Sequence, residues 1–158
     1  MASIHDFSVV SADGSRTIPL ASFAGRVLVI VNAASMCGFT AANMECLTSL
    51  QREFGSSRVQ VLLFPCGQFA NQEPKSACEF RDWAHERYDD ASILTSLEKV
   101  KVKGPDAHPL FVALQKSLGP IRWNFTKFVC DAHGVPVRKF DSAQCGTELR
   151  DAVALLIS

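Results

Sequence analysis

The chain has 158 residues, of which 47% are hydrophobic and 20% are charged, and its sixteen basic residues balance its sixteen acidic ones. This composition is typical of a globular protein, here expected to form a single domain over residues 1–158, and it argues against a disordered chain. The zero net charge disfavours binding to nucleic acid or to an anionic membrane surface, because such proteins need clustered positive charge.

Apolar runs in the sequence are short. The run at 59–65 contains Gln60 and is far too short to span a bilayer, so no integral membrane protein is expected. Residues 1–6 lack the basic start and the long apolar segment of a secretory signal peptide. We therefore expect a cytoplasmic protein.

Hydrophobic periodicity and turn residues predict alternating strands and helices. Thr40 and Ser76 are N-cap candidates for the first two helices. The order predicts an α/β fold of the thioredoxin-like kind, with a central mixed β-sheet flanked by helices and an added N-terminal β-hairpin. In chain order the expected elements are a hairpin (7–10 and 17–20), a buried strand (27–33), a helix (41–54), a second buried strand (59–64), a helix (76–88), a strand (95–102), a helix (108–118), a second hairpin (127–130 and 137–140) and a final helix from Thr147.

Cys37 lies between the end of the first buried strand and the start of the following helix. The positive end of the helix dipole at such a position stabilises the thiolate, which is the reactive form of cysteine. A free cysteine can equally be a small buried hydrophobic residue. Its position alone does not decide between a reactive and a structural role.

The chain has six cysteines, at positions 37, 46, 66, 78, 130 and 145. They form no Cys-x-x-Cys pair and no Cys/His cluster with zinc-ligand spacing, so no metal site is expected. In a reducing cytosol all six should be thiols at rest, and no structural disulfide framework is expected. Cys46, Cys130 and Cys145 are predicted to be structural or incidental.

Two further segments carry indole or amide donors that could meet Cys37 at the end of the sheet. They are Phe64-Pro65-Cys66-Gly67-Gln68-Phe69-Ala70-Asn71-Gln72-Glu73-Pro74 and Trp123-Asn124-Phe125-Thr126-Lys127-Phe128. Together with Val31-Asn32-Ala33-Ala34-Ser35-Met36-Cys37-Gly38-Phe39-Thr40, they resemble the motifs of the glutathione peroxidase family. The resemblance covers essentially the whole chain and is closest to the cysteine-containing, non-selenium members, often called thioredoxin-type peroxidases.

This resemblance implies that Cys37 is the peroxidatic residue and that Gln72, Trp123 and Asn124 complete the active site. A cysteine thiolate attacks one peroxide oxygen, the O–O bond breaks and a sulfenic acid forms. The indole N–H and the two amides can donate hydrogen bonds to the sulfur or to the departing oxygen. No metal or organic cofactor is implied, and a thiol reductant is the co-substrate. Gln68 is a second candidate donor, but the family pattern favours Gln72.

Thioredoxin-dependent members of the family commonly carry a resolving cysteine in the helix after the Gln-Glu-Pro turn. His85 occupies that position here and is expected to be partly buried, while Cys78 lies seven residues earlier in the same predicted helix, on a similar face. Cys78 could resolve the Cys37 sulfenic acid as an intramolecular disulfide that a thioredoxin-type protein opens. Alternatively, Cys78 is a buried structural residue, and glutathione or another external thiol performs the step. The sequence leaves both mechanisms open.

Two other departures from the family pattern bear on the site. Residues 119–122 form a short connection where tetrameric members carry a long insertion. The resemblance to monomeric members implies a monomer whose Cys37 region is open to bulky hydroperoxides and to a protein reductant. Gly67 and Ala70 replace the Asn and Gly that are most usual, and Ala70 is strained if its φ is positive.

The leading hypothesis is a thiol peroxidase that reduces hydrogen peroxide and organic or lipid hydroperoxides and is regenerated by a thioredoxin-type protein or glutathione. One alternative is a peroxide sensor that relays the oxidation of Cys37 to a protein partner. Another is a non-catalytic thioredoxin-fold binding module, in which Cys37 has ordinary reactivity.

Overall fold

A five-stranded mixed sheet forms the centre of the computed structural model, which describes residues 3–157. In the strand order β5-β4-β3-β6-β7, β3 is parallel to β4 and β4 to β5, whereas β6 is antiparallel to both of its neighbours. A separate antiparallel hairpin lies near the N-terminus. The strands are β1 (Ser8–Val10), β2 (Thr17–Pro19), β3 (Val27–Ala33), β4 (Val59–Pro65), β5 (Thr95–Ser96), β6 (Lys127–Cys130) and β7 (Pro136–Phe140).

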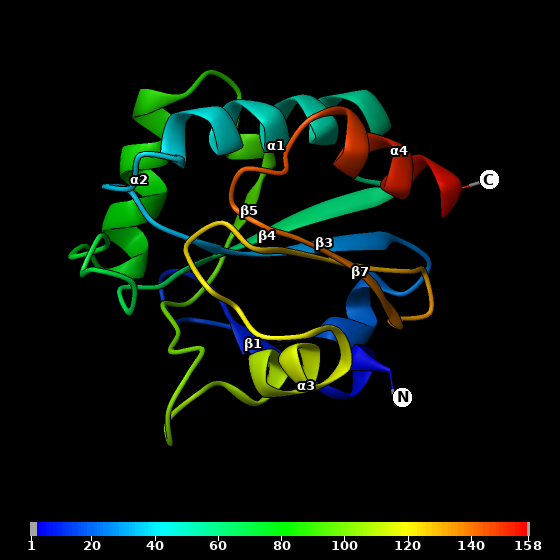
Figure 1. Ribbon diagram of the computed structural model, residues 1–158, viewed down its shortest axis with the longest axis horizontal. Helices are drawn as coiled ribbons and strands as arrows, with labels where there is room; N and C mark the ends of the chain where they lie inside the picture. Colours follow the sequence, from blue (N-terminus) through cyan, green and yellow to red (C-terminus); the bar gives the residue numbers. More distant parts are fainter. Residues whose placement is uncertain (1–2, 158) are drawn as a thin grey trace.

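Helices cover both faces of the sheet (Figure 1). One face carries α1, α2 and α4, and the other carries α3 and the N-terminal hairpin. The helices are α1 (Thr40–Phe54), α2 (Ala77–Arg87), α3 (Pro109–Leu118) and α4 (Thr147–Leu155), and short 3-10 turns occur at Ile4–Asp6, Leu20–Phe23 and Ala91–Ile93.

Successive side chains of β3 point to opposite faces of the sheet, and the hydrophobic interior is therefore divided into two layers. Val27, Val29 and Val31 pack toward α1 and α4, whereas Leu28 and Ile30 pack toward α3 and the hairpin. Every residue of β3 and β4 is buried, because each strand is covered on both faces. The predicted mixed α/β fold of the thioredoxin-like kind is therefore confirmed.

Two details of the predicted elements differ from the structure. The strand expected at 95–102 is only two residues long, because the backbone beyond it turns to the hairpin, where Glu98 N donates to Val10 O at 2.9 Å. Thr40 is the first residue of α1 rather than its N-cap, which is Phe39 and has no side-chain cap. Ser76, by contrast, caps α2 as predicted, through a reciprocal capping box with Glu79.

A disulfide joins Cys46 of α1 to Cys145 in the loop before α4, across 99 residues of sequence. The prediction that all six cysteines are thiols is therefore wrong for this pair. That expectation rested on the number of cysteines and on an assumed reducing cytosol. The bond instead depends on α1 and the loop before α4 lying together on one face of the sheet. The other four cysteines (37, 66, 78 and 130) are free.

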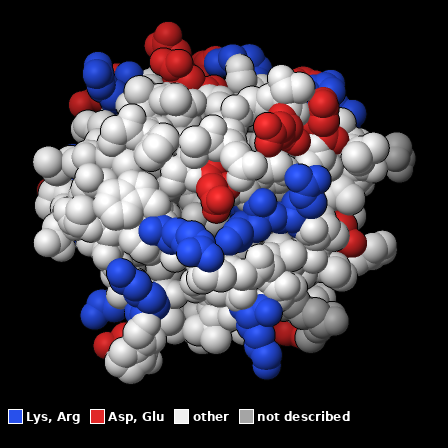
Figure 2. Space-filling model, viewed as in Figure 1, with Lys and Arg blue, Asp and Glu red and all other residues white. Residues whose placement is uncertain are grey.

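The surface in the view of Figure 2 carries charges of both signs. Basic side chains form a band across the middle of that face, and acidic ones gather above it, on the side where α1 and α4 lie in Figure 1. Within residues 3–157, no helix is both long enough and apolar enough to cross a membrane.

Breaking the disulfide should destabilise the fold. We expect Cys145→Ser to lower the free energy of unfolding by about 2–4 kcal/mol, because the bridge restricts the unfolded chain over a long loop. Urea unfolding under non-reducing conditions measures the difference. A reductant should bring the wild type to the level of the variant and leave the variant unchanged; a wild type insensitive to reductant would contradict this expectation.

Candidate active site

Three chain segments meet at one edge of the sheet because of how β3 is paired. β3 and β4 are parallel, with Ala33 opposite Pro65, so the loops that follow both strands leave at the same edge. β6 is antiparallel to β3, with Lys127 opposite Val31, so the segment that precedes β6 arrives there as well. We call these segments the thiol loop (34–39), the amide loop (66–76) and the Trp-Asn segment (123–126).

Cys37 lies in the thiol loop, three residues before the first residue of α1, and is 9% exposed. Its backbone N–H donates to the Thr40 hydroxyl at 3.2 Å, and that hydroxyl donates to Ala34 O at 2.7 Å. Phe39 N–H donates to the Cys37 sulfur, with an N–S distance of 3.4 Å. A backbone donor at the start of a helix therefore points at the sulfur.

Backbone and carboxylate hydrogen bonds hold the amide loop against the thiol loop. Met36 N donates to Gln72 O at 3.0 Å. The buried Glu73 carboxylate accepts from the backbone N–H of Ser35 at 2.9 Å and from its hydroxyl at 3.0 Å. Gln72 is therefore fixed beside the residue that precedes Cys37.

Asn124 and Gln72 are joined through their side chains. The Asn124 amide donates to Gln72 Oε1 at 2.9 Å, while Asn124 Oδ1 is buried and has no hydrogen-bond partner among the described residues. The backbone carbonyl of Asn124 accepts from the Ser142 hydroxyl. Trp123 is half-buried, its ring lies edge-on to Phe69, and its carbonyl accepts from Asn32 at 3.0 Å.

The structure thus brings the predicted residues to one edge of the sheet and links two of them directly. Within residues 3–157, the hydrogen bond that reaches the Cys37 sulfur comes from Phe39. Donation by Gln72, Trp123 or Asn124 to the reacting sulfur or oxygen therefore stays a prediction. Gln68 is occupied elsewhere, since its Oε1 accepts from Val102 N and its Nε2 donates to Lys103 O.

Strained backbone supports the loops of the site. Ala70, Asn71 and Phe125 all have positive φ, at 56°, 52° and 61°, a region that side chains with a Cβ disfavour. Ala70 therefore has the positive φ at which strain was expected. Gly67 has a different role: a Cβ there would lie 2.9 Å from Glu73 O, so the close approach of the two loop ends requires glycine.

The remaining thiols differ in surroundings. Cys78, half-buried in the first turn of α2, has its sulfur 3.5 Å from Ala12 O in the hairpin turn. Burial raises the pKa of the Cys66 thiol, and it raises that of Cys130 to about 12, so both stay protonated near neutral pH. His85 is exposed, so the prediction that it is partly buried is wrong.

Sequence reasoning missed several residues that hold the site. Asn32, a polar residue within a buried strand, accepts from Thr126 N and donates to Trp123 O, and its polarity could have marked it. Glu73 lies beside Gln72 and carried no signal beyond its charge. Ser142 supports Asn124 from 18 residues away, and no pattern in the sequence links the two.

Lys127 is fully buried behind the Trp-Asn segment. Its ammonium group donates to the backbone carbonyls of Asp141 and Ser142 at 2.9 and 3.2 Å. Burial lowers the pKa of Lys127 to about 8. Lys127 thus holds the chain that carries Ser142, at a cost in desolvation.

The sequence model of the family described as glutathione peroxidase matches residues 4–115. The chain belongs to the glutathione peroxidase family. It is 34% identical over 158 residues to a glutathione peroxidase of Lactococcus lactis subsp. cremoris, covering 97% of this chain and 98% of that protein. It is 42% identical over 150 residues to the hydroperoxy fatty acid reductase gpx1 of Synechocystis sp., covering 88% and 86% of the two chains.

Solved structures agree with the family and with the fold. The crystal structure of GPX1 from T. cruzi has a TM-score of 0.80 at 31% identity and covers 99% of this chain and 97% of that one. A thioredoxin-family thiol:disulfide interchange protein from Chlorobium tepidum, 16% identical, has a TM-score of 0.71, covers 96% of this chain and 93% of that chain, and shows the fold alone. The predicted membership of the glutathione peroxidase family, and with it the class of peroxidases, is confirmed.

In the described part of the chain, no three His, Cys, Asp or Glu side chains are grouped as metal ligands would be.

The low pKa of Lys127 predicts a dependence of stability on pH. The unfolded chain keeps the ordinary lysine pKa of about 10.5, so above pH 8 it binds more protons than the folded protein, and stability should rise with pH. We expect the unfolding free energy of the wild type, relative to Lys127→Met, to rise by on the order of 1–2 kcal/mol between pH 7.5 and 9.5. Urea unfolding of both proteins across this range measures it; a constant or falling difference would contradict the burial of a protonated lysine.

Proposed function

We propose that the protein is a thiol peroxidase in which Cys37 reduces hydrogen peroxide and organic or lipid hydroperoxides. The observation that carries the proposal is the position of the Cys37 sulfur at the start of α1, with the Phe39 N–H directed at it and the linked Gln72 and Asn124 amides beside its loop. No observation favours the peroxide-sensor alternative.

The reaction begins with attack of the Cys37 thiolate on one peroxide oxygen. The O–O bond breaks, the second oxygen leaves as water or as an alcohol after taking a proton, and Cys37 becomes a sulfenic acid. Charge develops on the departing oxygen, where donors held in place by the fold lower the barrier. We assign this role to the buried Asn124, whose side-chain amide is held by Gln72 and whose backbone carbonyl is held by Ser142.

The surroundings of Cys37 suit apolar hydroperoxides. Met36 and Phe39, on either side of it, are 61% and 39% exposed, which places apolar surface at the rim of the site. An acyl chain would cover this surface and remove it from water. The name of the Synechocystis relative, a hydroperoxy fatty acid reductase, supports the same class of substrate.

Regeneration requires two thiols. The first condenses with the sulfenic acid to form a disulfide and release water, and the second reduces that disulfide. The first thiol is Cys78 or an external thiol, and the reductant is a thioredoxin-type protein or glutathione. Cys78 sits in the first turn of α2, directly after the amide loop, so unwinding of that turn would free it to move toward Cys37. A monomeric state and a cytoplasmic location stay predictions.

Removal of the Cys37 thiol should abolish the reaction. We expect Cys37→Ser to reduce peroxide turnover to the background rate. Gln72→Ala and Asn124→Ala should each slow it by roughly tenfold to several hundredfold, which is the usual effect of losing one fixed donor. A coupled assay with thioredoxin or glutathione measures turnover. Gln68→Ala is the matched control, because Gln68 lies in the same loop but braces the 102–103 backbone, and it should stay within about threefold of wild type.

Substitution of Cys78 separates the two routes of regeneration. If Cys78 is the resolving residue, Cys78→Ser should lose turnover with thioredoxin while its first reaction with one equivalent of peroxide keeps the wild-type rate. Stopped-flow measurement of that first step and steady-state turnover give the two values. Unchanged turnover in Cys78→Ser would assign resolution to an external thiol.

A further inference from the structure

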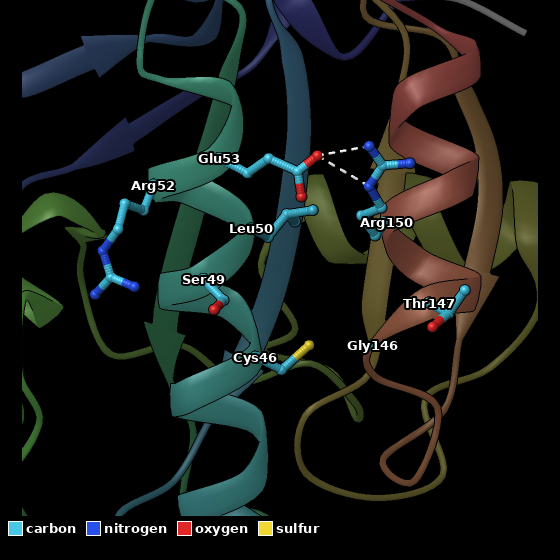
Figure 3. Close-up of a pocket in the computed structure, with 8 residues that line it drawn as sticks. All are labelled: Cys46, Ser49, Leu50, Arg52, Glu53, Gly146, Thr147 and Arg150. Carbon is cyan, nitrogen blue, oxygen red and sulfur yellow. Dashed lines mark hydrogen bonds and ion pairs between the residues drawn. The ribbon is translucent and has the colours of Figure 1, made fainter.

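Cys46, one half of the Cys46–Cys145 disulfide, lines a groove between α1 and α4 that does not include Cys37. The groove has a volume of about 530 Å³ and is lined by Cys46, Ser49, Leu50, Arg52, Glu53, Gly146, Thr147 and Arg150. In Figure 3 the Cys46 sulfur points from α1 across toward the chain at Gly146, and the Glu53–Arg150 ion pair bridges the two helices farther along. Both cysteines are only half-buried.

The disulfide and a hydrogen bond both join α1 to the segment that precedes α4. Asn43, three residues before Cys46 and so on the same side of α1, donates to Ser142 O at 2.9 Å. Ser142 in turn lies three residues before Cys145. The Asn43–Ser142 hydrogen bond and the Cys46–Cys145 disulfide therefore join the same two segments, three residues apart on each.

From Ser142 a continuous set of contacts leads to the reactive cysteine. The Ser142 hydroxyl donates to Asn124 O, and the Asn124 amide donates to Gln72. Gln72 O accepts from Met36 N, directly before Cys37. Ser142 thus helps to position Asn124, together with Gln72 and Asn32, and the disulfide restrains the loop that carries Ser142.

We infer that Cys46–Cys145 is a second redox site, open to thiol–disulfide exchange with small thiols through the α1–α4 groove, and that its reduction loosens the support of Asn124. A thiolate from the groove attacks Cys46, the S–S bond to Cys145 breaks, and a mixed disulfide forms on Cys46 while Cys145 takes a proton. A second small thiol then releases Cys46 and leaves as the oxidised small-molecule disulfide. Two electrons and two protons pass to the protein, and the reverse reaction closes the bridge.

Loosening is the expected consequence because the other restraints on the loop around Cys145 are local. Ala143, Gln144 and Gly146 are exposed, and Gln144 bonds to Asp141 in the same loop and to Glu148 in the first turn of α4, so these contacts do not replace the covalent link to α1. Ser142 would then be held by the Asn43 and Lys127 contacts to its carbonyl, without the covalent link. The effect on Cys37 rests on the proposed function; the exchange reaction itself does not.

Exchange is tested in Cys37→Ser, which removes the peroxidase chemistry. The folded protein is equilibrated with mixtures of glutathione and glutathione disulfide, alkylated, and mapped by mass spectrometry. We expect Cys46 and Cys145 to open and close together and reversibly, with glutathione trapped on Cys46. A bridge that stays closed in millimolar glutathione until the protein is unfolded would overturn the proposal, as would two thiols that never pair in glutathione disulfide.

Coupling to the site is tested by the rate at which Cys37 reacts with hydrogen peroxide. We expect Cys46→Ser and Cys145→Ser to slow this step by roughly tenfold, less than the about hundredfold that a misplacement of 1 Å can cost. The double variant should lose no more than either single one, because all three lack the same bond. Glu53→Gln, which removes the charge of the Glu53–Arg150 ion pair between α1 and α4, should keep the wild-type rate. Equal rates with and without the bridge would overturn the coupling, whereas absence of any Cys37 reaction in the wild type would refute the proposed peroxidase function and leave the exchange result standing.

Discussion

The pairing of β3 is the constraint on which the site depends. Its parallel partner β4 delivers the amide loop to the edge where the thiol loop leaves, and its antiparallel partner β6 begins at that same edge. A change of direction in either neighbour would carry its residues to the opposite end of the sheet. Asn32, inside β3, reinforces the convergence, because its side chain binds the backbone on both sides of Asn124.

The polar groups of the thiol loop are hydrogen-bonded in a way that leaves the Cys37 sulfur available. The Glu73 carboxylate accepts hydrogen bonds from the backbone N–H and the hydroxyl of Ser35, and the Thr40 hydroxyl accepts from the backbone N–H of Cys37. These donors are therefore already paired and do not bind the Cys37 sulfur. Positive φ at Ala70 and Phe125 stores strain in the flanking loops. Strain of this kind persists where the surrounding contacts determine the conformation, and the buried hydrogen bonds of this edge provide them.

Most of the fold could be predicted from the sequence, because buried strands and amphipathic helices carry strong periodic signals. The limits of β3 and the Ser76 N-cap of α2 agree with the expected elements. Contacts between distant residues could not be predicted. The Cys46–Cys145 bond, Ser142 on Asn124 and the buried Lys127 depend on how α4 and its preceding loop pack, and neither composition nor spacing reports this. The resemblance named Gln72 and Asn124, but only the structure shows that they bind each other.

The most direct test is to map every cysteine after treatment of the reduced protein with one equivalent of hydrogen peroxide and a sulfenic-acid trap. The account predicts that oxidation, as a trapped sulfenic acid or a disulfide formed from it, is found on Cys37. Cys66 and Cys130 should stay unmodified, because burial raises their pKa values and keeps them protonated. An unmodified Cys37, with the oxidation on another residue or on none, would contradict the assignment of this edge of the sheet as a peroxidase active site.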